Sequence, residues 1–77
     1  MNAQRRKSIQ EVIDQLTDLQ STVENLKDEE QEAYDNLPEN LQGSERGEAM
    51  SESADNLDSA YNSIDEVLEY LNTAIEG

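Results

Sequence analysis

The stretch that decides the fold runs from Met50 to Ile75 and reads MSESADNLDSAYNSIDEVLEYLNTAI. Its apolar residues recur in alternating steps of four and three, which places them on one face of an α-helix as a heptad stripe. The stripe consists of Met50, Ala54, Leu57, Tyr61, Ile64, Leu68, Leu71 and Ile75. A second apolar row of Ala60, Val67 and Ala74 runs beside it, so the apolar face is wider than a two-helix seam requires. We therefore expect this helix to touch more than one neighbour.

A further helix is predicted upstream, over about residues 3–37, because neither glycine nor proline interrupts this segment. Its apolar positions also follow steps of three and four, and Glu30 occupies the one place in the stripe where another apolar residue is expected. The stripe consists of Ile9, Val12, Leu16, Leu19, Val23, Leu26, Ala33 and Leu37. Ile13 and Tyr34 widen it. Ser8, with a glutamate three residues later, has the pattern of a capping box.

Residues 38–44 form the predicted connector. It begins with a proline, which ends the first helix and suits the start of one short helical turn. Gly43 permits a left-handed residue, and Ser44 is a good N-cap for a helix over about residues 45–75. Two helices of similar length joined by a short connector predict an antiparallel hairpin. The fold class is therefore all-α, with residues 1–77 forming a single domain.

Folding about the connector brings the two stripes face to face. It pairs Leu26 with Leu57, Leu19 with Ile64 and Val12 with Leu71. The additional apolar rows then remain exposed, and a second hairpin that covers them makes a four-helix or larger bundle. A chain of 77 residues that is 34% hydrophobic and lacks cysteine has few other ways to build a core. We expect the interface of this homodimer or higher oligomer to contain Ile13, Ala60, Tyr61, Val67, Tyr70 and Ala74.

The chain has a net charge of −14, from 19 acidic and 5 basic residues. Such a chain should repel nucleic acids and anionic membranes and attract basic protein surfaces. Acidic residues can also serve only to keep a helix face solvated. No apolar run approaches the roughly 20 residues of a membrane span, and no apolar segment follows the basic residues at positions 5–7 as it would in a signal peptide. We therefore expect a cytoplasmic protein that binds neither nucleic acid nor membranes directly.

Catalytic and metal-binding chemistry is not indicated. The chain has no cysteine and no histidine, which removes the commonest thiolate nucleophile, general base and transition-metal ligands. The acidic run Asp28–Glu32 lacks the glycine and the loop geometry of a calcium site. Carboxylates are so abundant that no pair stands out as acid and base. We expect a protein that is not an enzyme and that uses neither a metal nor a cofactor.

The best candidate for a ligand site is the start of the second helix, which reads Gly43-Ser44-Glu45-Arg46-Gly47. Free backbone N–H groups and the positive end of the helix dipole favour an anion there. Ser44 and Arg46 could donate hydrogen bonds to it, and Gly47 would allow its close approach. The segment is not a P-loop, because it lacks that motif's lysine and preceding strand. Alternatively, Ser44 only caps the helix, Arg46 pairs with a glutamate and Gly47 serves packing.

Two other places offer polar groups. Near the connector, small or polar residues at positions 49–54 face Glu30 and Tyr34, which with Arg46 could wall a cleft. Alternatively, the helices approach closely there and Glu30 reaches water. A basic head consists of Arg5, Arg6 and Lys7. In an antiparallel dimer this head would meet the Ser44–Gly47 turn of another chain and form an anion pocket between subunits, or else it is a solvated terminus.

The connector NLPENLQGSERGEA, Asn36 to Ala49, lies between two acidic heptad helices. In this arrangement the chain resembles small uncharacterised proteins encoded by phages and prophages of Gram-positive bacteria, over nearly its whole length. The resemblance implies no particular activity, but small acidic phage proteins often act against host defences. Three hypotheses follow. The protein binds and blocks a host protein through its acidic surface; it is an oligomeric sponge for an anionic nucleotide signal at subunit interfaces; or it is an assembly scaffold.

Overall fold

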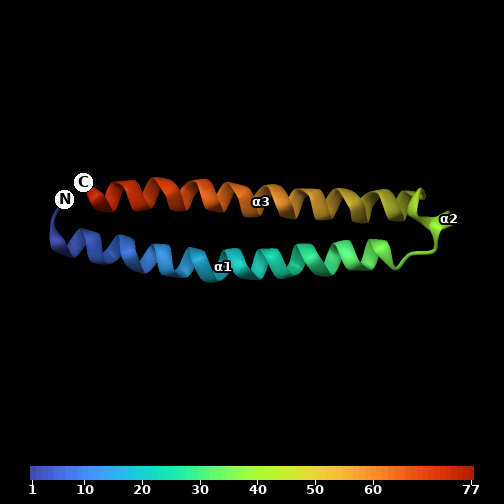
Figure 1. Ribbon diagram of the computed structural model, residues 1–77, viewed down its shortest axis with the longest axis horizontal. Helices are drawn as coiled ribbons and strands as arrows, with labels where there is room; N and C mark the ends of the chain where they lie inside the picture. The colour runs from blue at the N-terminus through green and yellow to red at the C-terminus, as the bar shows by residue number, and fades with distance from the viewer.

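The computed structural model describes residues 1–77 as two long antiparallel helices joined by a short one (Figure 1). Helix α1 spans Ala3–Asp35, α2 spans Glu39–Gln42 and α3 spans Glu45–Glu76. The two long helices lie side by side along their length, and both chain ends lie at the end opposite α2 (Figure 1). The Cα trace extends 58 × 15 × 12 Å. The prediction of an all-helical hairpin is confirmed.

Local sequence sets where each helix begins and ends. Helix α1 begins at Ala3, as predicted, and Ser8 lies within it instead of capping it. Asn2 is the cap, and its side chain accepts a hydrogen bond from the Arg5 N–H at 2.7 Å. Helix α1 ends at Asp35, two residues before the predicted end and three before Pro38. Proline disfavours helical geometry in the residue before it, so the chain leaves the helix ahead of that position.

The turn between α2 and α3 depends on Gly47, which is buried. A Cβ atom at Gly47 would overlap the backbone carbonyl oxygens of Gln42 and Leu41, so the close approach of α2 to α3 requires glycine. Gly43 differs, because it has φ −84° and open space where a Cβ would lie. The expectation of a left-handed residue at Gly43 is therefore wrong.

The inward face of α3 is the stripe that the sequence predicts. All eight of its members, from Met50 to Ile75, are buried or half-buried. Ala54 and Leu68 lie deepest, at 3% and 8% exposed. The neighbouring row is on the outside, since Val67 and Ala74 are exposed and Ala60 is half-buried.

The inward face of α1 differs from the prediction. The buried or half-buried residues in and just after this helix are Ile9, Ile13, Leu16, Gln20, Val23, Lys27, Glu30, Tyr34 and Leu37, which we call the inward row. Val12, Leu19 and Leu26 are instead 44%, 58% and 47% exposed, so their predicted pairing with α3 is wrong. Ile13 and Tyr34, expected on the outside, take part in the hairpin. Ile9, Leu16, Val23 and Leu37 lie on the inward face as predicted. Helix α1 is turned so that Ile13, Gln20, Lys27 and Tyr34 take the places expected for Val12, Leu19, Leu26 and Ala33.

The lengthwise alignment of the helices agrees with the prediction. The Gln20 side-chain amide donates hydrogen bonds to the Tyr61 carbonyl oxygen at 3.3 Å and to the Asp65 carboxylate at 3.2 Å. The Lys27 amino group lies 3.5 Å from the Asp58 carboxylate. Position 20 therefore lies level with positions 61–65, as expected from the predicted pairing of 19 with 64. Only 5 of 77 residues are buried, because two helices alone enclose little interior.

Candidate functional site

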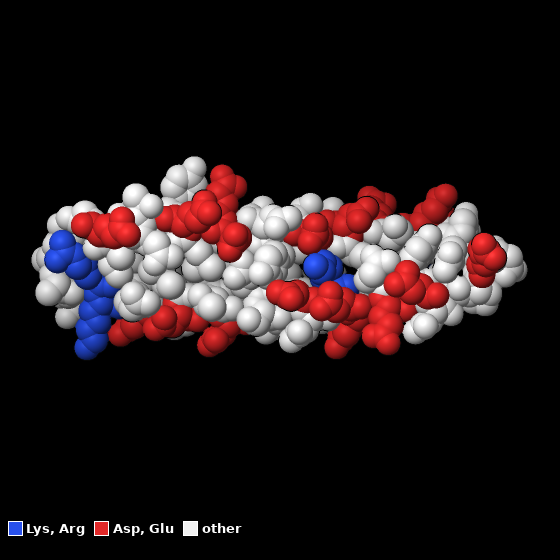
Figure 2. All heavy atoms as spheres, in the orientation of Figure 1, with Lys and Arg blue, Asp and Glu red and all other residues white.

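The charged groups of the hairpin are separated in space. Figure 2 shows one face, on which acidic groups gather over both long helices along the two edges. Basic groups appear there at the end with the chain termini and at one place near the middle (Figure 2). The molecule contains a single ion pair, between Lys27 and Asp58, against 19 acidic residues. Nearly all carboxylates are therefore unpaired and available to an external cation or basic group.

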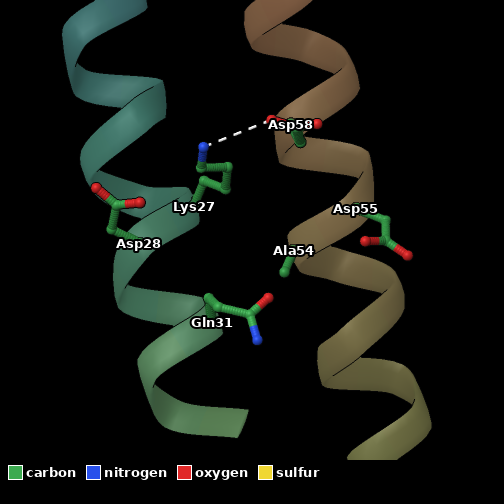
Figure 3. A pocket seen from close by; sticks show the side chains of 6 residues that line it. All are labelled: Lys27, Asp28, Gln31, Ala54, Asp55 and Asp58. Carbon is green, nitrogen blue, oxygen red and sulfur yellow. Dashed lines mark hydrogen bonds and ion pairs between the residues drawn. The ribbon is translucent and has the colours of Figure 1, made fainter. Parts of the chain in front are cut away.

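A shallow hollow of about 350 Å³ lies between α1 and α3 on the connector side of the molecule (Figure 3). Its lining consists of Lys27, Asp28, Gln31, Ala54, Asp55 and Asp58. The hollow arises because the small Ala54 lies on α3 where the inward row of α1 supplies Lys27 instead of a large apolar residue. The Lys27 amino group extends toward Asp58 on the opposite helix (Figure 3).

The chemistry of the hollow favours a positively charged group. The lining contains three carboxylates and one amino group, and Ala54 is its only apolar residue. Of the three, Asp58 points toward Lys27, whereas Asp28 and Asp55 point away from the opposite helix (Figure 3). There is no aromatic or large aliphatic wall on which a flat ligand could stack. No cluster of three or more acidic residues in the structure has the geometry to hold a metal ion. The net charge of the lining therefore suits a cationic group better than an anion.

Tyr61 lies beside the hollow, half-buried on the inward face of α3. The Lys27 amino group lies 6.0 Å from the centre of its ring, within the range of a cation–π contact. The negative charge of Glu24 raises the pKa of the Tyr61 phenol above its usual 10.0, and desolvation and Asp65 add to this effect. The phenol is therefore neutral at physiological pH, in keeping with the strongly negative surroundings.

The structure brings Ser44, Arg46 and Gly47 together at the start of α3, where the sequence suggests an anion site. The Ser44 hydroxyl donates to the Leu41 carbonyl oxygen and accepts from the Gly47 N–H at 3.3 Å. The space beside Gly47 is occupied by backbone carbonyl oxygens of α2, whose partial negative charge opposes an anion. Ser44 and Gly47 therefore stabilise the turn between α2 and α3. Arg46 is exposed and makes no ion pair.

The predicted cleft walled by Glu30, Tyr34 and Arg46 does not coincide with the hollow, whose lining includes none of the three. Glu30 and Tyr34 are half-buried in the inward row of α1, and Arg46 is exposed at the start of α3. The Tyr34 carbonyl oxygen accepts a hydrogen bond from the Gln42 side chain at 3.4 Å, which ties α1 to α2.

The basic head lies at the opposite end of the molecule from Arg46. The Arg6 guanidinium donates to the Ile75 carbonyl oxygen at 3.2 Å, so it interacts with the negative end of the α3 dipole. Arg5 and Lys7 are exposed. A single hairpin therefore does not bring the basic head and Arg46 together.

The structure exposes some residues of the predicted oligomer interface and buries others within the hairpin. Val67 and Tyr70 are 45% and 69% exposed, and Ala74 is exposed as well. Ile13, by contrast, is buried between the helices. Ala60 and Tyr61 are half-buried.

Sequence reasoning did not single out the hollow. The sequence feature that could have indicated it is Lys27, the one basic residue between the basic head and Arg46. Lys27 lies seven residues after Gln20 and so on the same face of the helix.

Comparison of the chain with models of protein families, with curated proteins and with solved structures gives no match. None of the helices has the length and apolar character needed to cross a membrane.

Proposed function

We propose that this protein is a non-enzymatic binding module that covers a basic surface of another protein with its acidic faces. The observation that supports this function best is the scarcity of internal ion pairs, since only one of the 19 acidic residues forms one. Unpaired carboxylates fixed on a rigid helical rod create a negative potential that speeds encounter with a basic partner and sets its orientation.

The hollow gives this proposal a specific point of contact. Asp28, Asp55 and Asp58 line the hollow, and we propose that it receives a lysine or arginine side chain of the partner. The contact of Lys27 with Asp58 supports this, because it shows an amino group paired with a carboxylate there. Charge-assisted hydrogen bonds of this type are about twice as strong as neutral ones. The resemblance to phage proteins makes the proposed partner a host protein, whose basic surface is blocked when the module is bound.

We further propose that α1 and α3 pack by heptad contacts and that the hairpin self-associates into a four-helix bundle. The steps of four and three in both inward faces support heptad packing. The alternative function as a nucleotide sponge relies on the basic head and Arg46. Because these lie at opposite ends of one hairpin, the sponge requires an antiparallel second copy.

Capture of proteins from a bacterial cell extract tests the acidic-surface proposal. The purified protein is immobilised and exposed to extract at low and at high salt, and the bound proteins are identified by mass spectrometry. We expect proteins with basic surfaces that are released by salt, because exposed charges are screened. The triple variant Asp28→Asn, Asp55→Asn, Asp58→Asn should bind the main captured protein about tenfold more weakly, at roughly 0.5 kcal/mol for each lost contact.

A matched control neutralises three acidic residues outside the hollow, namely Glu11→Gln, Asp18→Asn and Glu66→Gln. This control has the same net charge as the triple variant but keeps the hollow, so it should lose less affinity. Captured proteins that stay bound at high salt, or that bind the triple variant as well as the natural sequence, would contradict the proposal.

A further inference from the structure

The two broad sides of the hairpin differ in chemistry. One side, which we call the polar side, carries the residues that immediately follow inward residues, such as Glu24 and Gln31 on α1 and Asp58 and Asp65 on α3. Their placement follows from the contacts of Asp58 with Lys27 and of Asp65 with Gln20, and from the shared lining of the hollow by Gln31 and Asp58.

The opposite side carries the residues that immediately precede inward residues, because successive helix positions are about 100° apart. Its central rows are Val12, Leu19, Leu26 and Ala33 on α1 and Ser53, Ala60, Val67 and Ala74 on α3. None of these residues is charged, and we call this surface the uncharged side. It holds four of the seven exposed large apolar residues, with exposures of 44–58%. Tyr70, 69% exposed, lies at its edge.

Acidic residues avoid this side almost completely. The next rows outward are Ser8, Gln15, Thr22 and Glu29 on α1 and Ala49, Asn56, Ser63 and Tyr70 on α3. Glu29 is the one acidic residue among them, out of 19 in the chain. The two central rows end in basic residues, because Arg5 lies seven positions before Val12 and Arg46 lies seven positions before Ser53.

We propose that a second copy of this chain covers the uncharged side, antiparallel to the first, with the two connectors at opposite ends of the dimer. Charge selects this occupant. A basic partner is drawn to the polar side and the edges, where the carboxylates lie, whereas a second molecule of charge −14 can approach closely only where carboxylates are missing. A two-fold dimer places the same surface of both copies in contact, which requires a self-compatible surface such as this one.

The size of the uncharged side is sufficient for a stable dimer. It extends along the 58 Å length and the 15 Å width of the Cα trace. A standard protein–protein interface buries about 800 Å² on each partner, and a surface of these dimensions provides that area. Burial of its leucine and valine side chains would add the apolar core that a hairpin with 5 buried residues lacks.

The charges at the ends of the uncharged side select the antiparallel orientation. Leu19 is the middle residue of α1, so full overlap of two antiparallel copies places Leu19 against Leu19 of the second copy. Arg5 of one copy then lies level with Ala33 of the other and next to Glu29, one turn away. A parallel dimer would instead gather both basic heads at one end and leave Glu29 without a cation.

A single cysteine tests the orientation, because the natural chain contains none. Under mild oxidation, Leu19→Cys should yield a disulfide-linked dimer, since the two thiols face each other across the two-fold axis. Thr17→Cys, two residues away on the polar side, should stay uncrosslinked at the same concentration. Failure of Leu19→Cys to crosslink, or equal crosslinking of both variants, would overturn the antiparallel arrangement.

Sedimentation tests the dimer itself. The natural chain should sediment at twice its mass of 8.7 kDa, and Leu19→Glu should sediment as a monomer because it sets two carboxylates against each other. Thr17→Glu adds the same charge on the polar side and should remain dimeric. Circular dichroism should show that both variants stay helical. A monomeric natural chain, or a dimeric Leu19→Glu, would overturn the proposal.

Charge reversal tests the contact between Arg5 and Glu29. Arg5→Glu and Glu29→Arg should each weaken the dimer about fivefold, and the two together should restore it. Lack of restoration would contradict the antiparallel contact.

The uncharged side is the surface through which the self-association proposed above would occur. The dimer does not depend on the proposed binding of a basic partner by the acidic faces. Leu19→Glu leaves the hollow intact, so extract capture and sedimentation can fail independently.

Discussion

The two halves of the hairpin are built differently. Toward the chain termini, the inward row of α1 is apolar, with Ile9, Ile13 and Leu16 facing the end of α3. Toward the connector, polar residues enter the same row at Gln20, Lys27 and Glu30. Apolar burial is the main favourable term in folding, so the half near the termini should contribute most of the stability.

The half near the connector is held in place by other means. Its helices are joined covalently, Gln20 and Lys27 contact α3 through polar groups, and Gly47 allows α2 to pack closely. The hollow also lies in this half. Apolar contacts therefore predominate at the end with the chain termini, where no covalent link joins the two helices. The polar hollow lies in the other half, where the connector joins them.

Truncation of an apolar contact should show the largest difference between the halves. Ile13→Ala should lower the free energy of unfolding by about 2–3 kcal/mol, because Ile13 is only 8% exposed. Leu57→Ala, at a half-buried position near the connector, should lower it by about 1 kcal/mol. Urea denaturation followed by circular dichroism measures both. Equal losses would contradict the uneven distribution of stability.

The turn should be the most sensitive point of the connector half. Gly47→Ala should destabilise the hairpin by about 2 kcal/mol, because the added methyl group overlaps two backbone carbonyls of α2. Gly43→Ala is the matched control, since it has open space and a negative φ and should be neutral or stabilising by up to about 0.5 kcal/mol. Thermal melts of the two variants compare them directly. A tolerated Gly47→Ala would show that α2 does not need its close contact.

An apolar residue at position 20 should extend the apolar contacts between α1 and α3 toward the connector. Gln20→Leu should stabilise the hairpin by about 1 kcal/mol, because the position is only 8% exposed and Asp65, its exposed partner, can bind water instead. Gln20→Ala removes the same hydrogen bonds without adding apolar area and should destabilise. Urea midpoints distinguish the two. A less stable Gln20→Leu would mean that the hydrogen bonds to α3 matter more than apolar burial.

The ion pair in the hollow should contribute little. The side chains of Lys27 and Asp58 are 29% and 55% exposed at a separation of 3.5 Å, and pairs of this kind are worth about 0.5 kcal/mol or less. Asp58→Asn loses the pair, whereas Asp55→Asn removes an unpaired carboxylate from the same hollow. The difference between their melting temperatures isolates the pair and should vanish at high salt. A large difference that persists at high salt would point to a buried interaction.

The smallest expected effect is on the titration of Tyr61. Its pKa is raised mainly by Glu24, so Glu24→Gln should move the pKa down toward 10.0. Absorbance of the phenolate, measured with Tyr34→Phe and Tyr70→Phe in the background, follows Tyr61 alone. Because the folded-state pKa is the higher one, the associated stability is present below pH 10 and is lost as the pH rises through the folded value. An unchanged pKa in Glu24→Gln would contradict this account.

Periodicity alone predicted the helices and the inward face of α3, but not the rotation of α1. Two overlapping rows share Ile9, Leu16 and Val23 and differ in the residues between them. The row completed by Val12, Leu19 and Leu26 is the more apolar, and a count of hydrophobic positions therefore prefers it. The structure adopts the other row, in which Gln20 and Lys27 make their contacts with α3. A helix with apolar residues on two adjacent strips does not reveal by itself which strip faces its own chain.

The acidic surface was predictable and the hollow was not. Composition alone shows an excess of carboxylates, and helix periodicity places most of them away from the inward faces. The hollow instead depends on a small residue of α3, Ala54, lying close to Lys27 of α1. That pairing is set jointly by the alignment and the rotation of the two helices. Because the predicted rotation placed Leu26 on the inward face, it left Lys27 outside the predicted contacts with α3.

The length of the hairpin, 58 Å, has a consequence for how other molecules sense its charge. At 0.1 M salt the screening length is about 10 Å, so the molecule spans about six screening lengths. Its two ends are electrically independent. The three basic residues at the terminal end cannot offset the carboxylates near the connector, and a partner that approaches one end responds only to the charges nearby. The net charge therefore governs how the molecule moves in an electric field, but not what binds at any one point along it.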